Sequence, residues 1–165
     1  MSLSFDPNQN YFYFKNNKTI PLLFIHGVGL DHQMWEPQIR SLNEFSILTY
    51  DILGHGKTPY KKDKVSLEDF SDQINSILSH HEISKINLVG FSLGSLIALN
   101  FASSFQEKLN KLILIGTTYL RSEKERSLVL DRFNQAKLNK PISKQALKRW
   151  FSVEYLEKKP HPYVL

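Results

Sequence analysis

Short apolar runs alternate with helix-like segments along this chain, and this alternation limits the possible folds more than any other feature. The runs are rich in Ile, Leu, Val and aromatic residues, as is typical of strands buried on both faces. They are PLLFIH (21–26), FSILTYD (45–51), INLVGF (86–91) and KLILIG (111–116). The pattern predicts an α/β fold in which these four strands are parallel and helices cover both faces of the sheet.

The segments between the runs have helical periodicity. Ser66 followed by Asp69 matches a capping box, and apolar residues then recur on one face to about residue 82. A shorter amphipathic segment covers residues 34–42. Residues 93–105 are apolar nearly all round, which predicts a buried helix.

The two ends of the chain have different patterns. YFYFK (11–15), an Asn16-Asn17 turn and KTI (18–20) predict an opening hairpin. Residues 117–137 are charged and only loosely amphipathic, Pro141 interrupts them, and Ser143 is a candidate cap for a short helix through Trp150.

Composition excludes several classes of protein. A chain of 165 residues with 41% apolar content supports one sizeable core. Without cysteine there is no disulfide framework, thiolate zinc site or cysteine nucleophile. The start MSLSFDPNQN lacks the features of a signal peptide, and no uncharged apolar run approaches the roughly 18 residues of a membrane helix. We therefore expect a soluble, cytoplasmic protein with no membrane partner.

The net charge of +5 is concentrated in one segment. Residues 137–159 hold seven basic residues against Glu154 and Glu157, so the rest of the chain carries 14 basic and 14 acidic groups. The seven are Lys137, Lys140, Lys144, Lys148, Arg149, Lys158 and Lys159. A nucleic-acid interface would need a known module or more interleaved aromatics, so a solvated basic segment is the favoured interpretation and no nucleic-acid partner is expected. Attraction of anionic substrates is a weaker alternative.

A candidate nucleophile lies where the third run meets the buried helix. Gly90-Phe91-Ser92-Leu93-Gly94 matches G-x-S-x-G between an apolar strand and an apolar helix, the context that gives the motif its meaning. A turn that projects Ser92 from the sheet holds it in strained backbone angles, so the glycines two positions away must be small. The helix N-terminus favours a developing oxyanion. The alternative is that Ser92 only caps the helix.

A glycine-rich turn supports the first interpretation. His26-Gly27-Val28-Gly29 follows the first buried run, at the carboxyl edge where open α/β sheets bind ligands. In their order and spacing, HGVGLDHQMW, YDILGHGKT (50–58) and GFSLGS resemble the oxyanion loop, the loop after the fourth strand and the nucleophile elbow of the α/β-hydrolase superfamily. The resemblance covers about the first 116 residues.

This resemblance implies a role for each matching residue. Ser92 would attack a carbonyl carbon, and the backbone N–H groups of Val28 and Leu93 would hold the oxyanion. His26, Gly27, Gly29, Gly90 and Gly94 would shape the loops, and His26, Asp51 and His55 would be structural. Asp51 ends a strand, but the family's triad acid follows a later strand.

The resemblance also implies a domain plan. Residues 1–116 would form the N-terminal part of the hydrolase core without its last strands, and residues 117–165 would begin a helical cap. RWFSVEYLEKKP (149–160) looks like a cap helix of enol-lactonase-like or small carboxylesterase members, and an ordinary amphipathic surface helix is the alternative. In this plan KLILIG would be an open edge, which predicts self-association or pairing with a complementing segment.

A triad base and acid are missing from the expected positions. After Ser92 the one histidine is His161, flanked by prolines near the end of the chain, where a frayed residue is expected. Six acidic residues follow Ser92, none of them at a strand end: Glu107, Glu123, Glu125, Asp131, Glu154 and Glu157. We therefore expect the triad to be incomplete in this chain and its turnover to be low.

No cofactor or metal is expected. Phosphate-binding and dinucleotide-binding glycine patterns are absent from the sequence. His80 and His81 are expected to point to different sides of a helix, with no H-E-x-x-H motif or carboxylate cluster beside them. Three function classes remain: a serine hydrolase of a carboxylic ester, thioester or lactone, an inactive relative that binds a ligand or protein partner, and, ranked last, a basic surface-binding protein.

Overall fold

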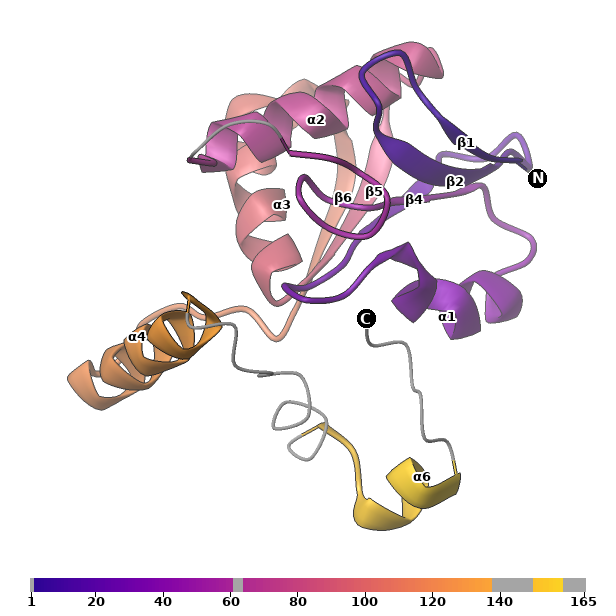
Figure 1. The fold of residues 1–165 in the computed structure, drawn as a ribbon. Helices are drawn as coiled ribbons and strands as arrows, with labels where there is room; N and C mark the ends of the chain where they lie inside the picture. The colour runs from indigo at the N-terminus through magenta and orange to yellow at the C-terminus, as the bar shows by residue number, and fades with distance from the viewer. Residues whose placement is uncertain (1, 61–63, 138–149, 159–165) are drawn as a thin grey trace. The chain divides into compact units, whose positions relative to one another are not determined.

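The computed structural model describes residues 2–60, 64–137 and 150–158 (Figure 1). The chain forms two compact units, residues 1–117 and residues 118–165. The first unit holds the sheet, and the second holds helices α4 and α6.

The first unit is built on a six-stranded mixed sheet with strand order β1-β2-β4-β3-β5-β6. Strands β3 (Leu22–Ile25), β4 (Ile47–Tyr50), β5 (Ile86–Phe91) and β6 (Leu109–Ile115) are mutually parallel where they pair. The four predicted strands and their direction are confirmed. Their carboxyl ends therefore lie at one edge of the sheet.

The predicted opening hairpin is wrong in one of its strands. Strand β2 (Tyr11–Lys15) pairs antiparallel with β1 (Ser2–Phe5) and with β4, whereas residues 18–20 form no strand. Lys18 has a φ of 59°, and the backbone N–H groups of Asn17 and Thr19 donate to the Ser46 hydroxyl. These side-chain contacts hold residues 16–20 in a connecting loop. The hairpin partner of β2 is instead β1, whose four-residue sequence SLSF is too short to predict a strand.

Helices cover both faces of the sheet, as predicted (Figure 1). Helices α2 (Leu67–His80) and α3 (Leu93–Ser104) pack on the face that carries Leu23, Leu48 and Leu88. The 3-10 helix η1 (His32–Trp35) and helix α1 (Glu36–Ser41) pack on the opposite face, against Phe24 and Val89. Successive residues of each strand thus alternate between two apolar clusters, as the two-residue period of a strand requires.

Local sequence signals set the helix boundaries. Helix α2 begins with the predicted capping box, in which the Ser66 hydroxyl accepts from the Asp69 N–H and the Asp69 carboxylate accepts from the Ser66 N–H. A short 3-10 helix, η2 (Gln106–Lys108), follows α3 and leads into β6. Helix α3 is buried on most sides, although Leu99 is exposed.

The second unit contains α4 (Glu123–Lys137) and α6 (Val153–Lys158). Ser122 and Glu125 form a capping box at the start of α4, and their Ser-x-x-Glu spacing is the local signal for it. Pro141 and most of the predicted helix from Ser143 to Trp150 lie outside the described residues.

Strand β6 is at one end of the sheet order and pairs only with β5 among the described strands. Apolar side chains on both of its faces reach solvent, including Leu112, Ile113 and Ile115. Its neighbour β5 is largely buried. The buried strand β5 therefore lies directly beside an apolar edge strand, β6, that is exposed to solvent.

Candidate active site

Ser92 lies in a sharp turn between β5 and α3. Its backbone has φ 54° and ψ −113°, a positive-φ conformation that residues with a Cβ rarely adopt. The hydroxyl does not cap α3, because no hydrogen bond joins it to the first turn of the helix. The side chain is partly exposed at the carboxyl end of β5. The interpretation of Ser92 as a plain helix cap is therefore not supported by the geometry.

The two glycines of the motif are required by close packing of backbone on backbone. A Cβ at Gly90 would lie 2.6 Å from the Gly94 carbonyl carbon and 2.8 Å from the Ser95 Cα. A Cβ at Gly94 would lie 2.8 Å from the His26 carbonyl oxygen. Real Cβ atoms do not come so close to a backbone, so strand β5, helix α3 and the loop after β3 meet here only because both positions lack a side chain.

The neighbouring strand ties down the turn. The Ser92 N–H donates to the Ile115 carbonyl oxygen at 2.9 Å, and the Ser95 hydroxyl donates to the Ser92 carbonyl oxygen at 2.7 Å. The same hydroxyl lies 3.2 Å from the Ile115 oxygen. Ser95 is buried, so these bonds are shielded from water. The strained conformation of Ser92 is thus held from both β6 and α3.

The glycine-rich turn after β3 lies against Ser92. A Cβ at Gly27 would be 3.3 Å from the Ser92 Cβ and 3.1 Å from a ring carbon of Phe91, so the turn passes directly beside the serine. Val28 is 60% exposed and Gly29 has a φ of 72°, the left-handed region that favours glycine. Leu93 is the first residue of α3, where a backbone N–H has no acceptor within the helix. Both predicted oxyanion donors are therefore on segments that border Ser92.

His26 is buried and links two loops through its ring. The Ile52 N–H donates to Nε2 at 3.0 Å, so Nδ1 carries the proton and donates to the Gly27 carbonyl oxygen at 2.8 Å. Burial lowers the pKa of His26 to about 4, which keeps the ring neutral and preserves this pair of bonds. His26 thus positions the glycine turn and does not face the serine as a base.

Asp51 is also committed to loop structure. Its carboxylate accepts from the His32 N–H, from the His32 ring Nδ1 at 2.6 Å and from the Lys57 N–H at 2.8 Å. Burial by itself would raise the pKa of Asp51, but the hydrogen bonds from His32 and Lys57 outweigh it and hold the pKa below its usual value. His55 contacts the Leu53 carbonyl oxygen, and its ring centroid is 5.4 Å from that of His26.

One group of possible metal ligands was not anticipated. The side chains of Asp31, His32 and Asp51 offer ligand atoms within 4.8 Å of one another, all on buried residues. Hydrogen bonds already use them, because Asp31 accepts from the Gln33 N–H at 2.8 Å and Asp51 accepts from His32. These hydrogen bonds join the loops after β3 and β4.

The expectation that His80 and His81 point apart is wrong. Their ring centroids are 4.8 Å apart, and both rings pack on Phe12. The helical spacing does not apply because α2 ends at His80 and His81 has non-helical angles, φ −101° and ψ 5°. Burial and the neighbouring His80 lower the pKa of His81.

No imidazole or carboxylate in the described ranges hydrogen-bonds the Ser92 hydroxyl. The described histidines bond elsewhere or pack on Phe12, as shown above for His26, His32, His55, His80 and His81. His161 lies outside the described residues. The structure therefore brings together the serine and both oxyanion segments, without a base beside them in its described part.

The sequence matches the family model described as the alpha/beta hydrolase fold over residues 20–162. The chain belongs to this family. It is 27% identical over 158 residues to (E)-2-((N-methylformamido)methylene)succinate hydrolase of Acinetobacter baylyi, covering 95% of this chain and 60% of that protein. It is also 33% identical over 79 residues to 3-oxoadipate enol-lactonase 1 of the same organism, covering 47% of this chain and 29% of that protein.

A solved structure shares the fold. The enol-lactonase from Burkholderia xenovorans superposes with a TM-score of 0.77 at 22% identity, covering 92% of this chain and 60% of that one. Together these comparisons establish a mostly parallel sheet of the α/β-hydrolase type and a hydrolase family. The chain spans about 60% of the length of the succinate hydrolase it resembles.

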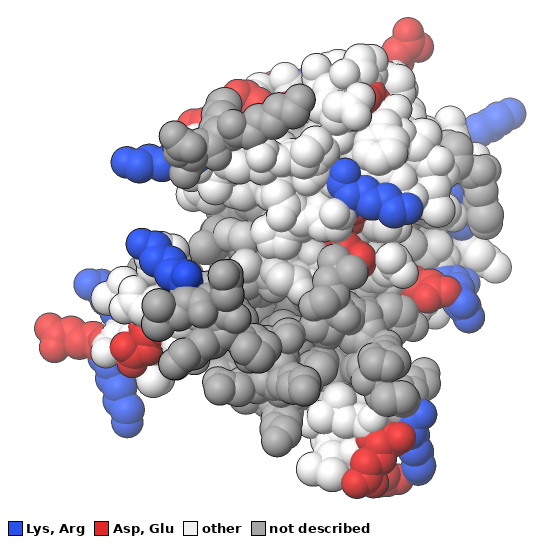
Figure 2. Space-filling model, in the orientation of Figure 1, with Lys and Arg blue, Asp and Glu red and all other residues white. Residues whose placement is uncertain are grey.

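Two broader expectations concern the surface. Among the described residues no helix is long and apolar enough to cross a membrane. Most of the basic segment 137–159 lies outside the described residues. On the face drawn in Figure 2, the described Lys and Arg side chains are scattered over the face and along its outline and form no continuous patch.

Proposed function

We propose that this chain carries the nucleophile and oxyanion hole of a serine hydrolase that acts on a carboxylic ester, thioester or lactone. The observation that carries the proposal is the strained turn at Ser92, held by glycine-only packing directly beside the Gly27 turn. A fold that keeps a serine in such angles places its hydroxyl at the ligand-binding edge of the sheet. The similarity to 3-oxoadipate enol-lactonase 1 supports the substrate class.

The proposed chemistry is acyl transfer. The Ser92 oxygen forms a bond to the carbonyl carbon while the hydroxyl proton passes to a base, and the carbonyl oxygen becomes an oxyanion. The N–H groups of Val28 and Leu93 stabilise that negative charge, and loss of one such donor lowers the rate about 100-fold to 1,000-fold. When the intermediate collapses, the bond from the carbonyl carbon to the leaving oxygen or sulfur breaks, and the base returns the proton to that atom. An alcohol or thiol departs, or the opened lactone keeps its hydroxyl on the acyl chain, and water then hydrolyses the acyl-serine.

The base is the component that the described residues do not supply. Loss of the base from a triad enzyme lowers the rate on the order of a million-fold, so the 165-residue chain alone is expected to turn over slowly. The same observation favours a second candidate function, an inactive relative that binds a ligand or protein partner at this edge.

Chemical rescue separates the two candidates. The purified chain is assayed on p-nitrophenyl acetate and butyrate with and without added imidazole, beside Ser92→Ala, which measures the background reaction of imidazole itself. A nucleophilic Ser92 predicts little turnover without imidazole and a saturable acceleration with it that Ser92→Ala lacks.

Each other outcome has a definite meaning. Robust turnover without imidazole that depends on Ser92 would show that a base is present in this chain. Equal rates for the chain and Ser92→Ala under all conditions would contradict the nucleophile assignment and leave the inactive, ligand-binding relative as the better description.

A further inference from the structure

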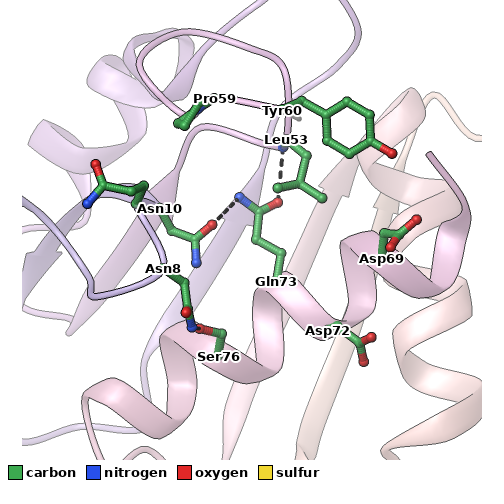
Figure 3. Close-up of a pocket in the computed structure, with 10 residues that line it drawn as sticks. Asn8, Asn10, Leu53, Pro59, Tyr60, Asp69, Asp72, Gln73 and Ser76 are labelled. Carbon is green, nitrogen blue, oxygen red and sulfur yellow. Dashed lines mark hydrogen bonds between the residues drawn. The ribbon is translucent and has the colours of Figure 1, made fainter. Parts of the chain in front are cut away.

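A cavity that Ser92 does not line opens on the first unit. It is bounded by the β1–β2 turn, the segment after β4 and helix α2, and its volume is about 480 Å³ (Figure 3). This volume is within the range of small-molecule sites. The proposed chemistry above does not use it.

The side-chain amide of Gln73 links the segments that line the cavity. Gln73 accepts from the Leu53 N–H at 3.1 Å and donates to the Asn10 side chain and to the Asp51 carbonyl oxygen, both at 3.0 Å. Gln73 is buried, so these bonds are protected from water. The turn, the loop and the helix that line the cavity are therefore held in one arrangement before any ligand binds.

The two sides of Gln73 differ in chemistry. Figure 3 shows Tyr60 and Asp69 on one side and Asn8 and Asn10 on the other. On the amide side, the Asn8 side-chain N–H donates to the Ser76 hydroxyl at 2.7 Å. This bond uses the amide nitrogen of Asn8 and leaves its carboxamide oxygen available as an acceptor. On the aromatic side, the Tyr60 hydroxyl donates to the Lys64 carbonyl oxygen.

The lining carries negative charge in a basic protein. Asp69 and Asp72 line it, and no Lys, Arg or His is among the described lining residues, although the chain has a net charge of +5. Asp69 is engaged in the capping box of α2, whereas Asp72 makes no hydrogen bond or ion pair within the described ranges. Leu53, Pro59 and the ring of Tyr60 supply an apolar wall beside these carboxylates.

We propose that this cavity binds a small organic cation, an amine with an apolar body. An ammonium group would meet the Asp72 carboxylate, and its apolar body would lie along Leu53, Pro59 and Tyr60, whose ring also attracts cations. The Asp72 carboxylate opposes anionic ligands, so the site favours a positively charged ligand.

The probe is phenethylamine, with 2-phenylethanol as its neutral counterpart of the same skeleton. We expect phenethylamine at low salt to shift the backbone amide signals of residues 8–10, 53 and 69–76 in NMR spectra of the ¹⁵N-labelled chain, with a Kd of about 1 mM. Added salt should weaken the effect because the Asp72 contact is exposed to solvent.

Two charge-matched variants locate the site. Asp72→Asn is expected to raise the Kd for phenethylamine about fivefold, the size of one partly exposed ion pair. Asp131→Asn removes the same charge from an exposed position on α4 and should leave the Kd unchanged.

Three results would overturn the proposal. They are an equal shift with 2-phenylethanol, an equal Kd for Asp72→Asn and the unchanged chain, and no shift of these amides at millimolar phenethylamine. Shifts of the same amides by a neutral monosaccharide but not by phenethylamine would instead identify a polyol site.

Discussion

Strands β5 and β6 are neighbours with similar sequences and opposite surroundings. Val89 of β5 pairs in register with Ile113 of β6, yet Val89 is 4% exposed and Ile113 is 45% exposed. Both strands have the apolar composition typical of a buried parallel strand. An apolar run therefore predicts a strand, but the position of that strand in the sheet order decides whether both of its sides are covered.

The exposed strand nevertheless supports the candidate site. The Ile115 carbonyl oxygen of β6 accepts the Ser92 N–H, so the strained turn at the end of β5 depends on a strand that is open on its other side. Close packing around the end of β5 sets the shape of the turn, and the hydrogen bond to β6 holds the turn from the other side.

The largest expected effect concerns Gly94, where the backbone of α3 packs tightly against the end of β3. Gly94→Ala would place a Cβ against the backbone of Ile25 and His26, which cannot move away as a flexible side chain can. We expect a loss of about 3 kcal/mol or more in the free energy of unfolding, measured by urea denaturation. Gly29→Ala is the control, because a Cβ there meets nothing within 4 Å and only the φ of 72° opposes it, at about 1 kcal/mol. Equal midpoints for the two variants would contradict the packing argument.

The second effect is acid sensitivity of the buried loops. His26 takes up its proton at about pH 4 when folded and near its ordinary pKa of 6.5 when unfolded, so between these values the unfolded chain binds more protons. Stability is therefore full above pH 6.5 and falls as the pH is lowered to about 4, by about 3 kcal/mol for this group. Urea midpoints measured across this range test the prediction.

His26→Gln is the matched variant for this test. Glutamine can accept from the Ile52 N–H and donate to the Gly27 oxygen, but it does not titrate. The variant should lose stability less steeply between pH 6.5 and 4, even if it is less stable at neutral pH. His81 also has a lowered pKa, so the remaining slope should shrink further in a variant that also lacks His81. An unchanged slope in His26→Gln would refute the assignment to His26.

The smallest effect compares the paired residues directly. Val89→Ala is expected to destabilise the chain by about 2 kcal/mol, since it empties buried space, and Ile113→Ala by less than about 1 kcal/mol, since much of that side chain already meets water.

We also propose that the open edge of β6 pairs with a second copy or a complementing segment, and Ile113→Lys should weaken such pairing. Sedimentation velocity over a range of concentrations measures it. A monomer at every concentration would contradict this proposal.

Much of the core fold could be predicted from the sequence. The four parallel strands, the capping box at Ser66 and the buried helix after Ser92 each follow from a local pattern with a physical cause. The partner of β2 could not, because β1 is only four residues long, too short for the alternation in SLSF to predict a strand. Residues 18–20 were misassigned because side-chain bonds to Ser46, distant in sequence, hold them out of the sheet.

The candidate site was predicted in part. The motif predicted the place of Ser92 and the need for glycine at positions 90 and 94, because both follow from the geometry of one turn. The contact between His32 and Asp51 was not foreseen, since it joins loops after two different strands. The cavity around Gln73 depends on three segments that meet only in the folded chain.

The backbone angles of Ser92 have a consequence for how this chain would change under selection. Glycine adopts a positive φ without penalty, so replacing Ser92 by glycine should relieve a local cost of about 1 to 3 kcal/mol while removing the hydroxyl. A screen for heat tolerance alone would therefore discard the proposed nucleophile, whereas a lineage that still needs acyl chemistry at this position must retain the less stable residue.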